Sequence, residues 1–131
     1  MSSQAPLEVR IDAPARLVHI RYLSDPTFQQ WVEAMEAIFA NPAFQSGFGF
    51  LSDRRPVDQA PSTLYVREVS QFIIDHADRL RGSRLAMVVG NTATYGTARM
   101  SHAMIQSTGL EQAVFTDPAE ALRWLNEPRS G

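Results

Sequence analysis

Apolar and polar residues alternate along parts of the chain in the two-residue period of β-strands. Residues Leu7–Asp12 alternate strictly, as expected of a strand with one face in water. A second strand is predicted at Leu17–Leu23, with Val18, Ile20 and Tyr22 on one face. Because only four residues separate the two segments, we expect them to form an antiparallel hairpin.

Three more strands are predicted further along. Gly47–Leu51 places two phenylalanines on one face and glycines on the other, where a helix can approach closely. Leu85–Val89 is continuously apolar, which is typical of a parallel strand covered on both faces. A short last strand is expected at Ala113–Phe115.

Helical spacing of apolar residues predicts a first helix after the hairpin. Asp25 is expected as its N-cap, with Pro26 in the first turn, and Asn41 marks its end. Its apolar stripe favours core packing over a ligand cavity and consists of Phe28, Trp31, Val32, Met35, Ile38 and Phe39.

The other helices alternate with the strands. We expect them at Thr63–Leu80, from about Ala93, and at Ala119–Asn126 after an Asp117 N-cap. The element order ββαβαβαβα predicts one α/β domain over residues 1–131, with flexible termini at 1–6 and 127–131. Its sheet is expected to be five-stranded and mostly parallel, with an antiparallel N-terminal strand and four helices.

The composition excludes several kinds of chemistry. With no cysteine there is neither disulfide nor thiolate, and because all 12 basic residues are arginines there is no lysine for a Schiff base or a phosphate loop. The net charge of −2 is spread thinly, which argues against nucleic acid as a partner. No apolar run is long enough for a membrane span, and we expect a cytoplasmic protein.

No complete catalytic or metal-binding set is found. His19, His76 and His102 are far apart and never at the spacing of a helical metal pair, so neither metal nor cofactor is expected. Ser101 and His102 are adjacent on a predicted helix and do not face each other, which argues against a serine nucleophile.

A candidate binding surface is predicted where two parallel strands end. Ligands of open α/β sheets bind beyond the carboxyl ends of the strands, and polar residues follow two predicted strands there. They are Asp53, Arg54 and Arg55, and then Asn91, Thr92 and Thr94 at a helix N-terminus that favours anions. Tyr95, Arg99 and His102 share one helical face, which is either a solvated stripe or a recognition stripe for an anion or a protein.

The segments YGTARM and AVFTDPAEALRWL, together with the element order, resemble the SpoIIAA-like proteins. These are small bacterial domains similar to STAS domains and related in shape to CRAL-TRIO lipid-binding domains, and the resemblance runs from about Leu7 to Leu125. In STAS antagonists a phosphorylated serine switches partner binding. The corresponding Asp-Ser pairing is absent here, because Asp53 precedes two arginines. Ser62, near the helix start, is the candidate phosphorylation site that the resemblance implies, and an N-cap role also accounts for it.

We therefore expect a non-enzymatic STAS-like domain that binds a protein partner or a small anionic or lipid-like ligand in bacterial signalling. The alternative is a small hydrolase or transferase, with Asp53 or His102 as base and Arg54 or Arg99 as anion holder. Leu7–Ile11 and Ala113–Phe115 are expected at the sheet edges, where a homodimer could form.

Overall fold

The computed structural model describes residues 5–57, 61–90 and 110–128. In chain order the elements are β1 (Leu7–Asp12), β2 (Leu17–Tyr22), α1 (Phe28–Ala40), β3 (Gly49–Asp53), α2 (Thr63–Asp75), β4 (Arg84–Val88), β5 (Glu111–Phe115) and α4 (Pro118–Asn126). The predicted single α/β domain with a mixed five-stranded sheet is confirmed for this part of the chain. The helix expected from about Ala93 lies outside the described residues.

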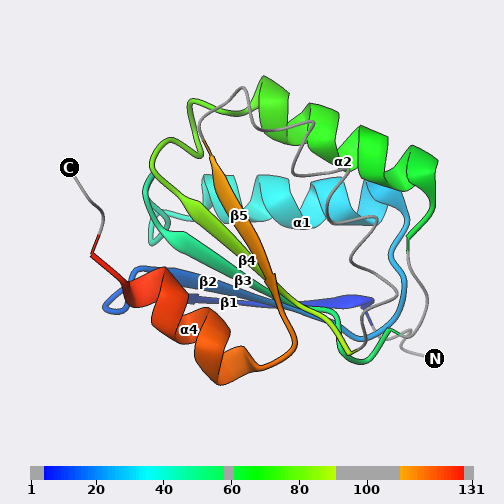
Figure 1. Cartoon of the computed structure of the whole chain (residues 1–131). Coiled ribbons are helices and arrows are strands. Elements are labelled where there is room, and N and C mark those ends of the chain that lie inside the picture. The colour runs from blue at the N-terminus through cyan, green and yellow to red at the C-terminus, as the bar shows by residue number, and fades with distance from the viewer. Residues whose placement is uncertain (1–4, 58–60, 91–109, 129–131) are drawn as a thin grey trace.

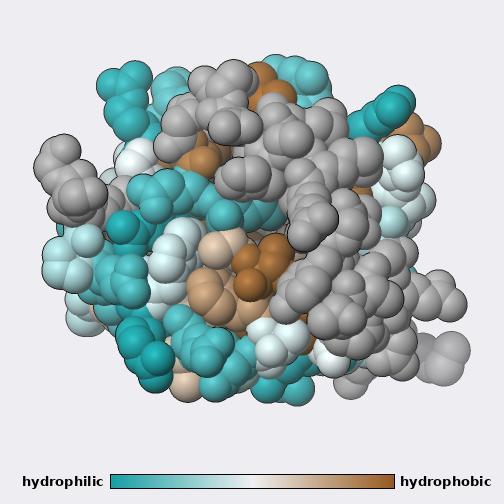
Figure 2. Space-filling view, in the orientation of Figure 1, coloured by the Kyte–Doolittle hydropathy of each residue, from teal (hydrophilic) through white to brown (hydrophobic). Residues whose placement is uncertain are grey.

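The strands lie in the sheet in their chain order, β1-β2-β3-β4-β5. β1 and β2 form the expected antiparallel hairpin, and every later pair is parallel. Helices α1 and α2 cover one face of the sheet, and α4 covers the other (Figure 1). β1 and β5 are the two edge strands, as predicted. Figure 2 shows an apolar patch over β5 on the visible side of the molecule.

The continuously apolar segment is indeed buried on both faces. β4 lies between β3 and β5, one strand in from the edge of the sheet. Ala86 and Val88 pack with Ala121 of α4, whereas Leu85 packs against the larger core under α1 and α2. Side chains alternate across a strand, so a sheet covered by helices on both faces needs apolar residues at successive positions.

Helix α1 begins two residues later than predicted. Its N-cap is Thr27, not Asp25. The Thr27 Oγ1 accepts from the Gln30 N–H at 3.1 Å, and the Gln30 Oε1 accepts from the Thr27 N–H at 2.8 Å. This reciprocal capping box satisfies two backbone donors, which a cap at Asp25 would leave unpaired. The predicted apolar stripe faces the core as expected.

Helix α2 begins where predicted but ends at Asp75 instead of Leu80. The Ser62 hydroxyl accepts from the Tyr65 N–H at 3.1 Å, which confirms Ser62 as the N-cap. Beyond His76 the backbone bonds tighten to three-residue spacing, as from Ala77 to Ile74 and from Arg79 to His76, so the chain continues as turns. Leu80 is nevertheless buried, which explains why its apolar spacing looked helical.

Strand β3 is shifted two residues from the predicted Gly47–Leu51. Gly47 lies before the strand with φ +98°, a conformation that glycine adopts at little cost. Gly49 lies inside β3 and faces α4: a Cβ there would be 3.0 Å from Leu17 Cδ2 and 3.1 Å from Leu125 Cδ2. The expectation that a strand glycine lets a helix approach closely is therefore confirmed at Gly49.

We predict that Gly49→Val destabilises the protein by about 1–3 kcal/mol, because the branched side chain overpacks the contact between β3 and α4. The loss is measured by urea unfolding monitored by circular dichroism. In a Leu125→Ala background the same substitution should cost less, because the contact with α4 is then removed and only the contact with Leu17 remains. An equal cost in both backgrounds would show that α4 does not rest on Gly49.

Candidate functional site

Asp53, the first of the predicted site residues, is hydrogen-bonded through both carboxylate oxygens to Arg55. Its Oδ1 accepts from the backbone N–H of Arg55 at 3.0 Å and from Arg55 Nε at 2.9 Å, and its Oδ2 accepts from Arg55 Nη2 at 2.7 Å. This two-point contact is the strong form of an arginine–carboxylate pair. The hydrogen bond from Arg55 holds the pKa of Asp53 below its ordinary value. Asp53 is therefore a stable anion and a poor general base near neutral pH.

Arg54 lies in the protein interior. It is 4% exposed, and its Nη2 lies 3.2 Å from Asp25 Oδ1. Its guanidinium is stacked over the Tyr22 ring, 4.6 Å from the ring centre. The backbone N–H of Arg54 donates to Val88 O at 2.8 Å. A buried cation needs such partners, so Arg54 joins the end of β3 to the segment before α1. An incoming anion would have to displace Asp25.

The remaining predicted site residues cannot be placed beside these. Asn91, Thr92, Thr94, Tyr95, Arg99 and His102 all lie outside the described residues. Only the Asp53–Arg55 part of the predicted surface is therefore described, and there the exposed Arg55 is already paired with the partly buried Asp53.

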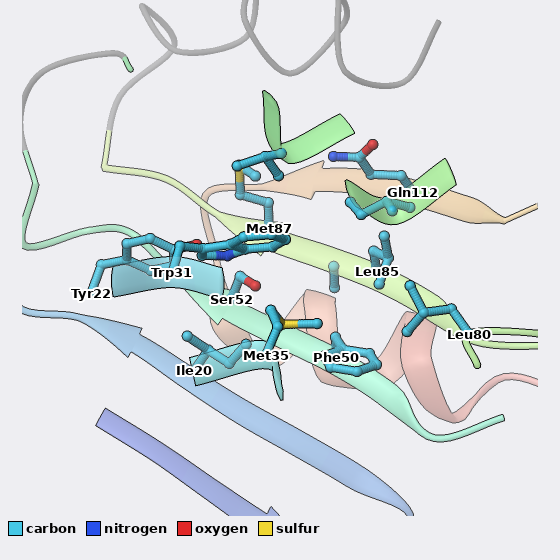
Figure 3. Close-up of a pocket in the computed structure, with 13 residues that line it drawn as sticks. Ile20, Tyr22, Trp31, Met35, Phe50, Ser52, Leu80, Leu85, Met87 and Gln112 are labelled. Carbon is cyan, nitrogen blue, oxygen red and sulfur yellow. The ribbon is translucent and has the colours of Figure 1, made fainter. Parts of the chain in front are cut away.

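A cavity of about 80 Å³ lies between the sheet and helices α1 and α2 (Figure 3). Its wall is mostly apolar and comes from both layers, and it includes Met35, Phe50, Ile73, Leu80, Leu85 and Met87. Apart from the Tyr22 hydroxyl and the Trp31 indole N–H, the polar side chains in this wall are Ser52 of β3 and Gln112 of β5. No charged residue is among the described residues that line it.

Gln112 is the residue at this cavity that sequence reasoning missed. Its Oε1 is buried and has no hydrogen-bond partner within the described residues. An unpaired buried acceptor of this kind costs about 1–3 kcal/mol. The side chain lies beside the cavity wall formed by Leu85 and Met87 (Figure 3). The signal in the sequence was a polar residue next to an apolar strand, but the predicted strand began one residue later, at Ala113.

A second, polar hollow of about 280 Å³ lies on the other face of the sheet, over β1, β2 and β3. Helix α4 packs on β3, β4 and β5 and leaves this half of the face open. Glu8, Arg10, His19, Arg21 and Asp53 line the hollow. Arginines and carboxylates alternate here, so the hollow has no excess of either sign. Burial and the nearby Arg10 lower the pKa of His19, which favours its neutral form.

The described ranges contain no group of three histidine, aspartate or glutamate side chains that could hold a metal ion. Within the same ranges, no helix is both long enough and apolar enough to cross a membrane.

Comparison with known proteins supports the fold. No protein-family model and no curated protein matches the chain. A solved structure from Shewanella loihica PV-4, an uncharacterized protein of the DUF3478 family described as having a SpoIIAA-like fold, superposes with a TM-score of 0.61. The alignment covers 95% of this chain and 98% of that chain at 19% identity. This chain therefore has the SpoIIAA-like fold that its sequence resembles.

We predict that Asp53 titrates below the ordinary aspartate pKa of about 3.9 and that Arg55→Gln moves its pKa upward. Because the folded-state pKa is lowered, the stability that this pair contributes is present above the ordinary value. It is lost as the pH falls through the folded-state pKa. Carboxyl carbon NMR measures both titrations. Arg67→Gln, an exposed change on α2, should leave Asp53 unchanged, and a midpoint near neutral pH would restore Asp53 as a candidate base.

Proposed function

We propose that this domain is a non-enzymatic binding module for a small lipid-like ligand. The ligand occupies the cavity between the sheet and helices α1 and α2, with its apolar part against the wall and a hydroxyl or other donor on Gln112. The observation that carries this proposal is an apolar cavity whose lining includes Gln112, a side chain with a buried and unpaired Oε1. A ligand that donates a hydrogen bond would satisfy an acceptor for which the described residues provide no donor.

The size of the cavity limits what it accepts without movement. A dry cavity of roughly 150 Å³ holds benzene, and a water takes roughly 30 Å³, so about 80 Å³ admits a short alkyl segment or a few waters. A longer ligand requires the wall to move. Met35 and Met87 line this wall, and methionine adapts its shape more readily than branched side chains.

The chemistry of the wall favours a neutral or weakly polar ligand over an anion. No cation faces the cavity from the described residues, and an uncompensated charge in an apolar site is costly. The arginines at the carboxyl edge are also occupied, Arg54 by Asp25 and Arg55 by Asp53. These contacts favour the lipid-like ligand among the expected classes. They also argue against the hydrolase or transferase alternative insofar as it relies on Asp53 and Arg54.

We predict that Gln112→Met raises the free energy of unfolding by about 1 kcal/mol, because it removes an unpaired buried acceptor. The same change should weaken binding of 1-octanol several-fold, because the donor on the ligand loses its partner. Thermal unfolding and NMR titration with 1-octanol measure the two effects. A residue with a purely structural role would not combine higher stability with weaker binding.

The controls separate the ligand chemistry from general hydrophobic binding. Gln71→Met, an exposed change on α2 that removes only a hydrogen bond to Asp75, should lower the free energy of unfolding by less than about 0.5 kcal/mol and leave 1-octanol binding unchanged. Octanoate, which at neutral pH is charged and donates no hydrogen bond, should bind the native protein at least about tenfold more weakly than 1-octanol. If neither compound shifts the resonances of cavity residues, and native mass spectrometry shows no co-purified ligand, the cavity is not a binding site.

A further inference from the structure

The outer edge of β1 has no partner strand from the described part of the chain. β1 is the first strand of the sheet and pairs only with β2 among the described strands. Its central residues Glu8, Val9 and Arg10 are all exposed. Val9 is 40% exposed and is one of two large apolar side chains exposed in the described ranges, the other being Leu64. Val9 therefore places an exposed apolar side chain on an edge strand, whose unpaired backbone groups are a template for pairing with another chain.

The hydrogen bonds of the hairpin show which backbone groups face outward. The N–H of Leu23 donates to Pro6 O at 2.8 Å, and the register continues from Leu7 opposite Tyr22 to Asp12 opposite Leu17. Hydrogen-bonded pairs alternate along an antiparallel ladder, so Glu8, Arg10 and Asp12 bond to β2. The N–H and C=O groups of Leu7, Val9 and Ile11 therefore point away from the sheet, toward the open edge.

The sequence of this edge complements itself. Leu-Glu-Val-Arg-Ile reads as apolar, acidic, apolar, basic, apolar around Val9. If a second copy lies antiparallel with Val9 facing the partner's Val9, then Glu8 lies opposite the partner's Arg10. Leu7 then lies opposite the partner's Ile11. Opposite charges on facing residues stabilise strand pairs, and here each copy supplies one member of each ion pair.

We propose that β1 is the interface of a homodimer, in which two copies pair antiparallel about a twofold axis at Val9 and join their sheets into one. The outward backbone groups of Leu7, Val9 and Ile11 pair with those of the partner. Glu8 and the partner's Arg10 occupy the non-hydrogen-bonded positions, where facing side chains are closest. Because the same patch serves both copies, the assembly closes as a dimer and does not extend further through this edge.

The other edge of the sheet lacks this complementarity. An antiparallel pairing of two β5 strands about Ala113 would place Glu111 opposite the partner's Phe115, with no opposite charge to meet it. Glu111 already forms an ion pair with Arg84 at 3.3 Å in its own chain, whereas the contact of Arg10 with Asp12 on β1 is longer, at 3.7 Å. The apolar patch over β5 in Figure 2 nevertheless makes this edge the competing interface, and the experiment distinguishes the two.

Single-cysteine cross-linking tests the register directly, because the chain has no cysteine of its own. Facing residues in a hydrogen-bonded antiparallel pair have Cα atoms about 5.5 Å apart, within the range that a disulfide spans. We expect Val9→Cys to give a disulfide-linked dimer on mild oxidation, seen by intact mass. Leu64→Cys, at the other exposed apolar position, should remain monomeric. Absence of a Val9→Cys dimer, or preferential cross-linking of Ala113→Cys, would overturn the proposal.

Charge reversal tests the ion pairs. The readout is the rate of disulfide cross-linking, which captures a weak association that gel filtration would miss. Either Glu8→Arg or Arg10→Glu in the Val9→Cys protein should slow cross-linking by about tenfold, because like charges then face each other. The two changes together should restore the original rate. Circular dichroism confirms that each variant is folded, and Arg67→Glu on α2 serves as the control. If the double change is as slow as the single ones, the two copies do not pair in this register.

Discussion

The arrangement of helices over the sheet is the constraint on which the rest of the structure depends. α1 and α2 cover one face, whereas α4 covers only the β3–β5 part of the other. The strands under α4 must be apolar on both faces, which is why Arg84–Val88 carries four apolar residues in succession. None of the described helices packs on this face of β1 and β2, so apolar and polar residues can alternate there, and the charged side chains of Glu8, Arg10 and Arg21 lie on it. The position of the polar hollow follows from this unequal coverage.

The sequence predicted features that depend on local chemistry more successfully than features that depend on distant partners. Asp117 caps α4 as expected, because its side chain accepts from the nearby Ala119 N–H at 2.9 Å. The similar Asp25-Pro26 pair does not cap α1, because Thr27 and Gln30 satisfy each other and Asp25 instead neutralises Arg54. Nothing in the spacing of Asp25 and Arg54 along the chain indicates that they meet.

The contacts of the candidate-site residues were even harder to predict from the sequence. Asp53, Arg54 and Arg55 were correctly expected at the carboxyl end of a strand, but their role depends on where each side chain turns. Arg54 turns inward to the Tyr22 ring, and Arg55 folds back on Asp53, so the charges at this edge are neutralised within the chain. For Gln112 the sequence shows only a polar residue beside an apolar strand, and its unpaired acceptor is recognised only once the surroundings of the side chain are known.

The proposed ligand cavity and the proposed dimer edge use different residues of the same sheet. The cavity is lined from β2 to β5 and by the two helices above them, and no residue of β1 contributes to its wall. The edge uses outward backbone groups of β1 and the facing side chains of Glu8 and Arg10. Pairing there extends the sheet beyond β1 without displacing a cavity residue, and ligand entry requires no change in the hairpin register. Binding and dimerisation can therefore be present together or separately, and evidence against one leaves the physical argument for the other intact.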